Sequence, residues 1–429
     1  MTQFSTYTNE FLNTNKTIYE VVMLADRYGN LAGGTGGTSV DGFGRLRVGE
    51  PHTLFESSNR FQIAELFSSA NTGTSTIEFV STDGCINLTI GTAATDNIVR
   101  ETKKVFPYQP GKSLLVMNTA TFAEPKANLV QRVGYFSANN GVYIEQEDNT
   151  TYMVMRSQST GAATSNNRIA RTDWNVDKFD GTGPSGYTLD MTKSQIFWSD
   201  FEWLGVGTVR TGFVINGELV IAHKFHHANL GKSTYMTTAC LPIRYEILNK
   251  GVTANNSTMK QICSAVISEG GYNQVTITRS ASNLITGKTL PSGGVKTPMI
   301  SIRLRAGRTD AIVLPSTVTM YGFQNTPFKI YLMKDGILTS PTWANTDSKS
   351  SVEYDLDATA ITGGTVVYEQ VFKGQETVSP LFLLNHFNHS LQLTRDLGQT
   401  TGNTFSVVVE ATTNNDKALT SLSWQEHTV

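Results

Sequence analysis

Hydrophobic and polar residues alternate over short runs along this chain, and turn residues separate the runs. The run at residues 141–147 (GVYIEQE) places Tyr143, Glu145 and Glu147 on one face of an extended backbone. The block at residues 195–247 is rich in aromatic and β-branched residues and shows no helical spacing. A two-residue period with these residue types is typical of strands. The chain is therefore predicted to be all-β.

One turn in this block is predicted in detail. Asn216 and Gly217 lie between the runs GTVRTGFVI and ELVIAHKF. A two-residue hairpin turn requires positive φ at both central residues, and Asn-Gly adopts that conformation at the lowest steric cost. The two runs are expected to pair as an antiparallel hairpin.

Similar runs recur towards the C-terminus, for example at residues 300–307, 311–322, 327–336 and 404–413. Many short strands with frequent turns, and no fixed-period repeat, indicate a sandwich or barrel rather than a propeller or solenoid. We expect antiparallel β-sandwich, jelly-roll-like domains preceded by an extended N-terminal arm.

The length of 429 residues exceeds what one ordinary core accommodates, so more than one domain is expected. Residues 1–40 include the Gly- and Thr-rich stretch LAGGTGGTSV and are assigned as the arm and linker. Residues 41–262 are assigned to the main β-sandwich domain, and residues 263–429 to a C-terminal β-rich domain. The arm either straps a neighbouring subunit or folds back on its own domain.

Composition and charge exclude several classes of protein. Charged residues are 16% of the chain, and the formal charge of -2 is spread without long runs of either sign, which argues against nucleic-acid binding.

The N-terminal sequence has no basic region followed by an apolar core, and no apolar run approaches the length of a membrane span. The chain is expected to be made and kept in the cytosol. Its three cysteines are sparse and odd in number, so free thiols are expected.

The sequence offers little chemistry. His223 and His227 share a face in HKFHH and could bind a metal, but no Cys or acidic ligand stands at zinc spacing, so structural histidines are favoured. Asp200 with Glu202, and Glu145 with Glu147, are same-face carboxylates compatible with glycoside hydrolysis or with an ordinary β-surface. No catalytic or dinucleotide motif accompanies them. We predict no enzyme activity, no catalytic residue, no metal and no cofactor.

Aromatic residues gather near the loop at residues 171–189. Trp174 and Tyr187 are candidate contacts for a glycan, because exposed aromatic rings stack on sugar rings. Aromatic residues at this density in a sandwich more often pack in the core. The sequence leaves both interpretations open.

Several long stretches of the chain resemble a family of virion structural proteins of tailed bacteriophages, especially marine and cyanobacterial ones. The matching stretches include DGFGRLRVGEPHTLFESSNRF at residues 41–61 and DGTGPSGYTLDMTKSQIFWSDFEWLGVGTVRTGFV at residues 180–214. Shorter stretches match at residues 100–119, 131–146 and 241–247. The resemblance is dense over residues 41–250 and loose beyond, and it brings no catalytic residues.

This resemblance implies a non-enzymatic structural component of the virion, assembled in the host cytoplasm. A tail, baseplate or fibre-attachment position is favoured over head decoration, and a host-glycan-binding module is the alternative from another class. The expected partners are other virion proteins, copies of the chain in a trimer or hexamer, and a host surface glycan, without nucleic acid or membrane insertion. Arg45, Arg47, Tyr108 and Lys112 are candidate assembly contacts; simple surface charge is the alternative for the two arginines.

Overall fold

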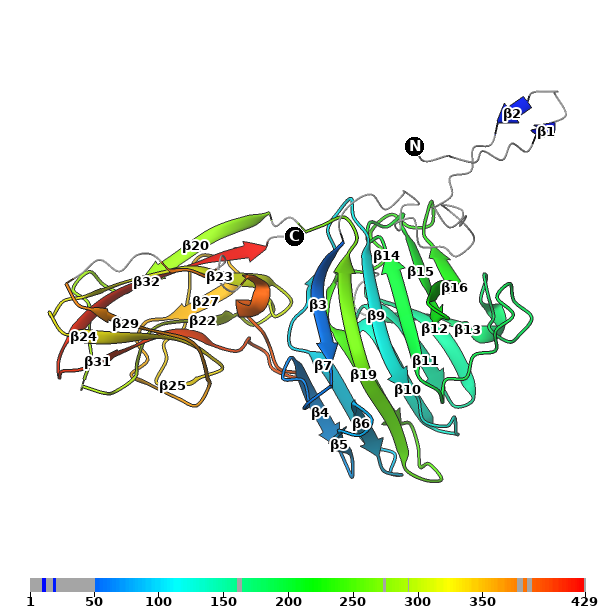
Figure 1. Ribbon diagram of the computed structural model, residues 1–429, viewed down its shortest axis with the longest axis horizontal. Coiled ribbons are helices and arrows are strands. Elements are labelled where there is room, and N and C mark those ends of the chain that lie inside the picture. Colours follow the sequence, from blue (N-terminus) through cyan, green and yellow to red (C-terminus); the bar gives the residue numbers. More distant parts are fainter. Residues whose placement is uncertain are drawn as a thin grey trace, which may run out of the picture.

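The computed structural model describes residues 51–159, 164–272, 275–291, 293–375, 383 and 390–427, together with the backbone of residues 10–12, 18–20, 381–382 and 388–389. These residues form two β-sandwiches joined side by side, which confirms the predicted all-β class (Figure 1). The 3-10 helices in this part of the chain are η1 (Arg171–Asp173) and η2 (Asn388–Leu391). No helix among the described residues is long and apolar enough to cross a membrane.

The first sandwich packs a seven-stranded sheet against an eight-stranded sheet, and all strand pairs in both are antiparallel. In spatial order the seven strands are β13 (Ser165–Ala170), β12 (Thr150–Ser157), β11 (Gly141–Glu147), β10 (Leu129–Phe136), β18 (Ile243–Asn249), β7 (Asn97–Thr102) and β4 (Phe67–Thr72). The facing sheet contains β16 (Glu218–His226), β15 (Thr208–Ile215), β14 (Gln195–Phe201), β9 (Leu114–Thr121), β19 (Ser257–Ser268), β6 (Cys85–Ile90) and β5 (Thr76–Val80), with β3 (His52–Ser58) paired to β19.

The second sandwich is smaller. Its five-stranded sheet contains β20 (Thr276–Ser282), β32 (Lys417–His427), β23 (Ile312–Gly322) and β30 (Leu381–Phe382), with β21 (Lys288–Thr289) paired to β32. Its six-stranded sheet contains β26 (Ala344–Asn345), β27 (Val352–Asp355), β22 (Thr297–Leu304), β31 (Phe405–Ala411), β24 (Pro327–Lys334) and β29 (Thr365–Lys373). A separate pair joins β25 (Ile337–Thr339) to β28 (Ala360–Thr362).

Each sandwich has its own hydrophobic core. Alternate residues of β14 and β15 point inward in the first sandwich, including Phe197, Phe201 and Phe213, and they pack with Val133 and Tyr135 of β10. The second core is a separate cluster that includes Met299, Phe328, Val407 and Trp424. Alternation along the strands therefore places the apolar faces inside both sandwiches, as a two-residue period requires.

The predicted hairpin is confirmed. β15 pairs with β16, and Ile215 lies opposite Glu218 across the turn. Both central residues have positive φ, 52° at Asn216 and 88° at Gly217. The turn chemistry that Asn-Gly supplies thus fixes the register of these two strands.

The predicted domain boundary after residue 262 lies inside β19. Residues 263–268 pair with both β3 and β9 of the first sandwich, so this unit extends to Ser268. Because β19 lies between β9 and β6 in the middle of the sheet, cutting it would leave its neighbours unpaired. Of the predicted arm at residues 1–40, the structure describes the backbone pairing of β1 (Glu10–Leu12) with β2 (Ile18–Glu20), and the rest lies outside the described residues.

Candidate functional site: a pocket between the two sandwiches

The first sandwich contributes a short two-stranded ribbon at its edge. β8 (Phe106–Pro107) pairs with β17 (Cys240–Leu241), and the Tyr108 N–H donates to the Ala239 carbonyl at 2.9 Å. The hydroxyl of fully buried Tyr135 lies 2.6 Å from the Phe106 carbonyl and accepts the Leu241 N–H at 3.0 Å. A core side chain thereby fixes both strands of the ribbon, and the ribbon is a rigid support for a site.

A segment of the second sandwich docks next to this ribbon. The Arg395 guanidinium lies 3.1 Å from Glu101 of β7, and the Lys103 ammonium lies 3.3 Å from Asp396. The backbone contributes as well, because the Arg395 N–H donates to the Lys103 carbonyl and the Leu397 N–H donates to the Ser68 hydroxyl, at 3.1 and 3.0 Å. Several polar contacts therefore hold the two sandwiches in one relative placement.

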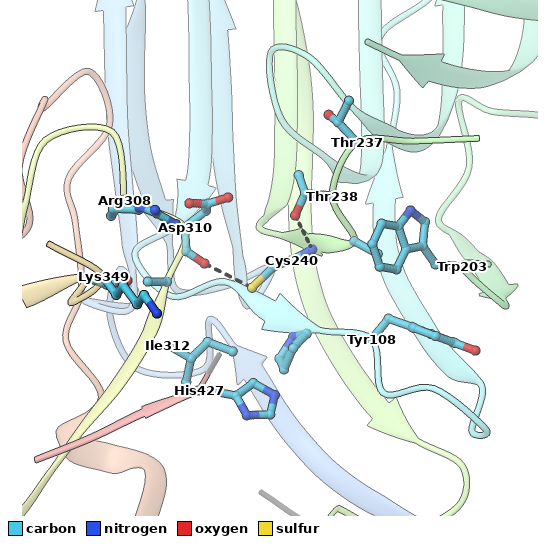
Figure 2. A pocket seen from close by; sticks show the side chains of 14 residues that line it. Tyr108, Trp203, Thr237, Thr238, Cys240, Arg308, Asp310, Ile312, Lys349 and His427 are labelled. Carbon is cyan, nitrogen blue, oxygen red and sulfur yellow. Dashed lines mark hydrogen bonds between the residues drawn. The ribbon is translucent and has the colours of Figure 1, made fainter. Parts of the chain in front are cut away.

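A pocket of about 430 Å³ lies between the ribbon and the second sandwich (Figure 2). The ribbon side is lined by the ring of Trp203 and by Tyr108, Thr237, Thr238 and Cys240. The opposite wall comes from three turns or strand ends of the second sandwich, and it carries Arg308, Asp310, Lys349, Ser351 and His427. Domain interfaces are a common place for ligand sites because two walls can close on one molecule.

The ribbon wall is held in place by hydrogen bonds and a ring contact. The Trp203 Nε1–H donates to the Met236 carbonyl at 2.8 Å, and its ring meets Tyr108 edge-on at a centroid distance of 6.4 Å. Trp203 remains partly exposed, whereas Tyr108 is only 2% exposed. The Cys240 thiol lies 3.1 Å from the Asp310 carbonyl, and burial raises the pKa of this thiol well above its usual range. Cys240 is therefore a neutral link between the walls, without thiolate reactivity.

His427 closes the other end of the pocket. Its Nδ1 lies 3.1 Å from the Val275 carbonyl, which fixes the proton on that nitrogen when the ring is neutral. Its Nε2 is buried and has no hydrogen-bond partner within the described part of the chain. Burial lowers the pKa of His427. At neutral pH this ring therefore offers an acceptor rather than a charge.

The candidate assembly contacts have other places in the structure. Arg45 and Arg47 lie outside the described residues. The Tyr108 ring is buried and stacks near Phe201 of the core. The Lys112 ammonium donates to the Gln109 side chain at 3.0 Å and to the Gly271 carbonyl at 3.1 Å. Tyr108 and Lys112 are thus engaged within the first sandwich.

Of the two interpretations of Trp174, glycan contact or core packing, the structure has the ring in the core. Trp174 is 2% exposed and packs between Phe179 and Phe213, and its indole N–H donates to the Ile169 carbonyl. The loop at residues 171–189 folds its apolar side chains into the core, so the ring has no free face. Tyr187 is 39% exposed, but its hydroxyl accepts a hydrogen bond from Asn216, and it lies outside the pocket lining.

The histidine cluster serves packing. His223 and His227 are buried while His226 is exposed; the His227 ring stacks on Tyr235 at 4.0 Å and bonds to the Gly207 carbonyl. Burial lowers the pKa of His223 to about 4 and also lowers the pKa of His227. Within the described ranges, no group of three or more His, Cys, Asp or Glu side chains could hold a metal ion. The three cysteines are free thiols, and only Cys85 is fully buried.

The paired carboxylates are engaged by cations. Asp200 is fully buried and bonds to Arg210 directly across β14 and β15. Glu145 is 2% exposed and lies 2.5 Å from Arg132 and 2.6 Å from Arg168. Such ion pairs hold the carboxylates in place, which suits a structural role better than proton transfer.

The sequence reasoning missed the far wall of the pocket. Arg308, Asp310, Lys349 and His427 come from separate loops and the last strand, and no local motif joins them. Their only signal is polar turn sequence, GRTD and TDSKS, between strand-like runs. Such sequence marks any surface loop, and only the docking of two sandwiches brings these side chains together.

No protein-family model and no curated protein matches the sequence. Solved structures with a similar fold include an endo-acting O-glycanase of the human gut microbiota, with 12% identity and a TM-score of 0.35, covering 51% of this chain and 99% of that chain. Another is the CBM2 module of an evolved Dit from Lactobacillus casei BL23 phage J-1, with 7% identity, a TM-score of 0.34 and coverages of 52% and 99%. A third is a Bacteroides ovatus GH16 protein, with 10% identity, a TM-score of 0.35 and coverages of 50% and 99%. Likeness at this level supports no statement about activity or ligand.

Proposed function

We propose that this chain binds a glycan in the pocket between its two sandwiches, as a non-enzymatic structural component of a tailed bacteriophage particle. The observation that supports binding is the pairing of a partly exposed indole, Trp203, with a wall of charged and hydroxyl side chains across a 430 Å³ space. A sugar ring has an apolar face and a rim of hydroxyl groups, and this pocket offers a complement to each.

The far wall supplies directed hydrogen bonds for hydroxyl groups. Asp310 is a carboxylate acceptor, Arg308 and Lys349 are donors, and the buried Nε2 of His427 is an unused acceptor. Thr237 and Thr238 add hydroxyl groups on the ribbon side (Figure 2). Donors and acceptors on both walls can bind the rim of a sugar whose flat face lies against the indole.

Binding without hydrolysis is the better proposal for this site. Retaining and inverting glycosidases use two carboxyl groups on either side of the bond that breaks. Among the described residues, Asp310 is the only carboxylate that lines the pocket, whereas Asp200 and Glu145, one member of each pair that the sequence offered, bond to arginines elsewhere. The pocket therefore has the groups for recognition and lacks a second carboxylate for chemistry.

The particle context rests on the sequence resemblance over residues 41–250. A tail, baseplate or fibre position, as a trimer or hexamer with other virion proteins, is the favoured placement, and head decoration is the alternative. Glycan recognition favours an appendage, because an appendage contacts the host surface first.

Antibody labelling of intact particles tests this placement. With an antibody against residues 275–427, we expect label at the tail or its tip in electron micrographs. Particles from a strain lacking the gene are the matched control and should carry no label. Label spread over the capsid faces would instead identify a head-decoration protein, and label on no particle would remove the virion proposal.

Replacing Trp203 with alanine is expected to weaken glycan binding about tenfold, because the stacking surface for the sugar is lost. The measurement is titration calorimetry on the purified chain with the oligosaccharide that an array screen selects. Tyr187→Ala is the matched control, since Tyr187 is an exposed aromatic residue outside the pocket. Circular dichroism confirms that both variants are folded. Unchanged affinity in Trp203→Ala would place the glycan elsewhere and contradict the proposed site.

A further inference from the structure

Arg308 lines the pocket without a carboxylate partner among the described residues. Most described arginines form ion pairs with carboxylates, namely Arg132, Arg168, Arg210, Arg244, Arg279, Arg303 and Arg395. Within the described residues, the Arg308 guanidinium makes no ion pair and no side-chain hydrogen bond, and it lines the pocket. A chain with so few charges therefore leaves one of its cations unmatched at the site.

Lys349 repeats this pattern from a second turn. Its ammonium also belongs to no ion pair in the described ranges, although its backbone N–H donates to the Asp347 carboxylate at 2.7 Å. The backbone at Arg308 is likewise fixed, since the Arg308 N–H donates to the Arg305 carbonyl and the Ala311 N–H to the Arg308 carbonyl. Both cations thus extend from turns that hydrogen bonds hold in shape, and both lie on the same wall (Figure 2).

The charge balance of the pocket is positive. Among the described residues, the lining holds two cations, Arg308 and Lys349, against one anion, Asp310, which gives these residues a net charge of +1. His427 adds none at neutral pH, because burial lowers the pKa of its ring. The lining residues of the first sandwich, including Trp203 and Thr238, are uncharged. An anionic group on the ligand would therefore find cations only on the wall that the second sandwich contributes.

We infer that the glycan is acidic, with a carboxylate-bearing sugar whose anionic group lies between Arg308 and Lys349 while its ring stacks on Trp203. This inference rests on the proposed function. A guanidinium presents a planar pair of N–H donors that matches a carboxylate, and an ammonium adds a second charge-assisted bond. Asp310, on the same loop as Arg308, accepts hydrogen bonds from neighbouring hydroxyl groups and so distinguishes a sugar acid from a simple anion.

A glycan array with matched pairs tests the inference on the whole chain. Each backbone is printed in a neutral form and in a carboxylated form, with a uronate or sialic acid residue as the only difference. We expect the carboxylated member of a pair to bind at least tenfold more tightly in 50 mM salt, as loss of a charge-assisted hydrogen bond costs about that much. Because the pocket is open to solvent, the preference should shrink at 0.5 M salt.

Arg308→Gln and Lys349→Gln should each lower the preference for the carboxylated member about tenfold and leave affinity for the neutral member within about twofold. Lys329→Gln is the matched control, because Lys329 is a partly exposed lysine of the second sandwich that pairs with Glu369 outside the pocket. Melting temperatures of all three variants should stay close to the parent value.

The outcomes separate the two proposals. Equal binding of neutral and carboxylated members, with loss of both in Trp203→Ala, would overturn the acidic ligand and leave glycan binding standing. Binding to no glycan on the array would overturn the proposed function and this inference together. A carboxylate preference that persists in Arg308→Gln, Lys349→Gln and the double variant would place the anion outside this pocket and overturn the inference.

Discussion

Replacing Trp174 with alanine is expected to lower the free energy of unfolding of the first sandwich by about 3–5 kcal/mol, the usual range for removing a buried tryptophan. The indole is 2% exposed, meets Phe179 edge-on at 6.4 Å and lies 6.3 Å from the ring centre of Phe213. Its N–H also anchors the loop to the end of β13 through the Ile169 carbonyl at 3.1 Å. Removing the indole would leave a cavity in the core and would deprive the Ile169 carbonyl of its hydrogen-bond donor. Differential scanning calorimetry, with the transitions of the two sandwiches resolved, is the measurement.

Tyr187→Ala in the same loop is the matched control and should change stability by less than about 0.5 kcal/mol, as exposed side chains usually do. The two variants separate a packing role from a binding role for the loop. If Trp174→Ala kept its parent stability but lost glycan binding, the ring would be a ligand contact, and the site between the sandwiches would be the wrong one.

Local signals in the sequence predicted the strands well where both the pattern and the turn agree. The run at residues 141–147 matches β11 along its whole length, and Asn-Gly at 216–217 gives the observed hairpin. The alternation of side chains along a strand and the conformation of a tight turn are both set by residues close together in sequence. Both can therefore be predicted from local sequence.

The burial of Trp174 could not be predicted from local sequence. The surrounding residues, RTDWNVDKFDGTGPSG, are rich in Gly and Asp and carry every mark of a surface loop. The chain nevertheless buries Trp174 and Phe179 from this loop against β15. Whether an aromatic residue in a loop faces solvent or the core depends on which strands lie beneath it, and this is a long-range property.

The pocket between the sandwiches depends on even longer-range contacts. Trp203 and Arg308 are about one hundred residues apart in sequence, and the contacts of Arg395 and Asp396 with the first sandwich bring their walls together. Dependence on contacts between residues far apart in sequence also explains why the boundary predicted after residue 262 lies inside β19. A boundary between domains is visible only when strand pairing across the sheet is known.

Replacing Glu145 with alanine is expected to lower the free energy of unfolding of the first sandwich by about 3 kcal/mol, because Arg132 and Arg168 lose the buried carboxylate that they share. Glu145 of β11 is 2% exposed and bonds to Arg132 from the neighbouring strand β10 and to Arg168 from β13, which lies one strand further on beyond β12. Arg132 keeps Glu246 at 3.3 Å, which limits the loss. Calorimetric or denaturant unfolding measures the change.

The matched control is Glu369→Ala, which removes a carboxylate from an exposed pair with Lys329 at 3.1 Å and should cost at most about 1 kcal/mol. Burial is the variable that differs between the two pairs, since Glu369 is 46% exposed at its side chain. Replacing a catalytic carboxylate by alanine is expected to have the opposite effect. Catalytic carboxylates are often held in an unfavourable charge environment, so their removal leaves the free energy of unfolding unchanged or raises it. An unaltered or higher free energy of unfolding in Glu145→Ala, with any loss of glycan cleavage, would therefore move this pair from the architecture of the sheet to an active site.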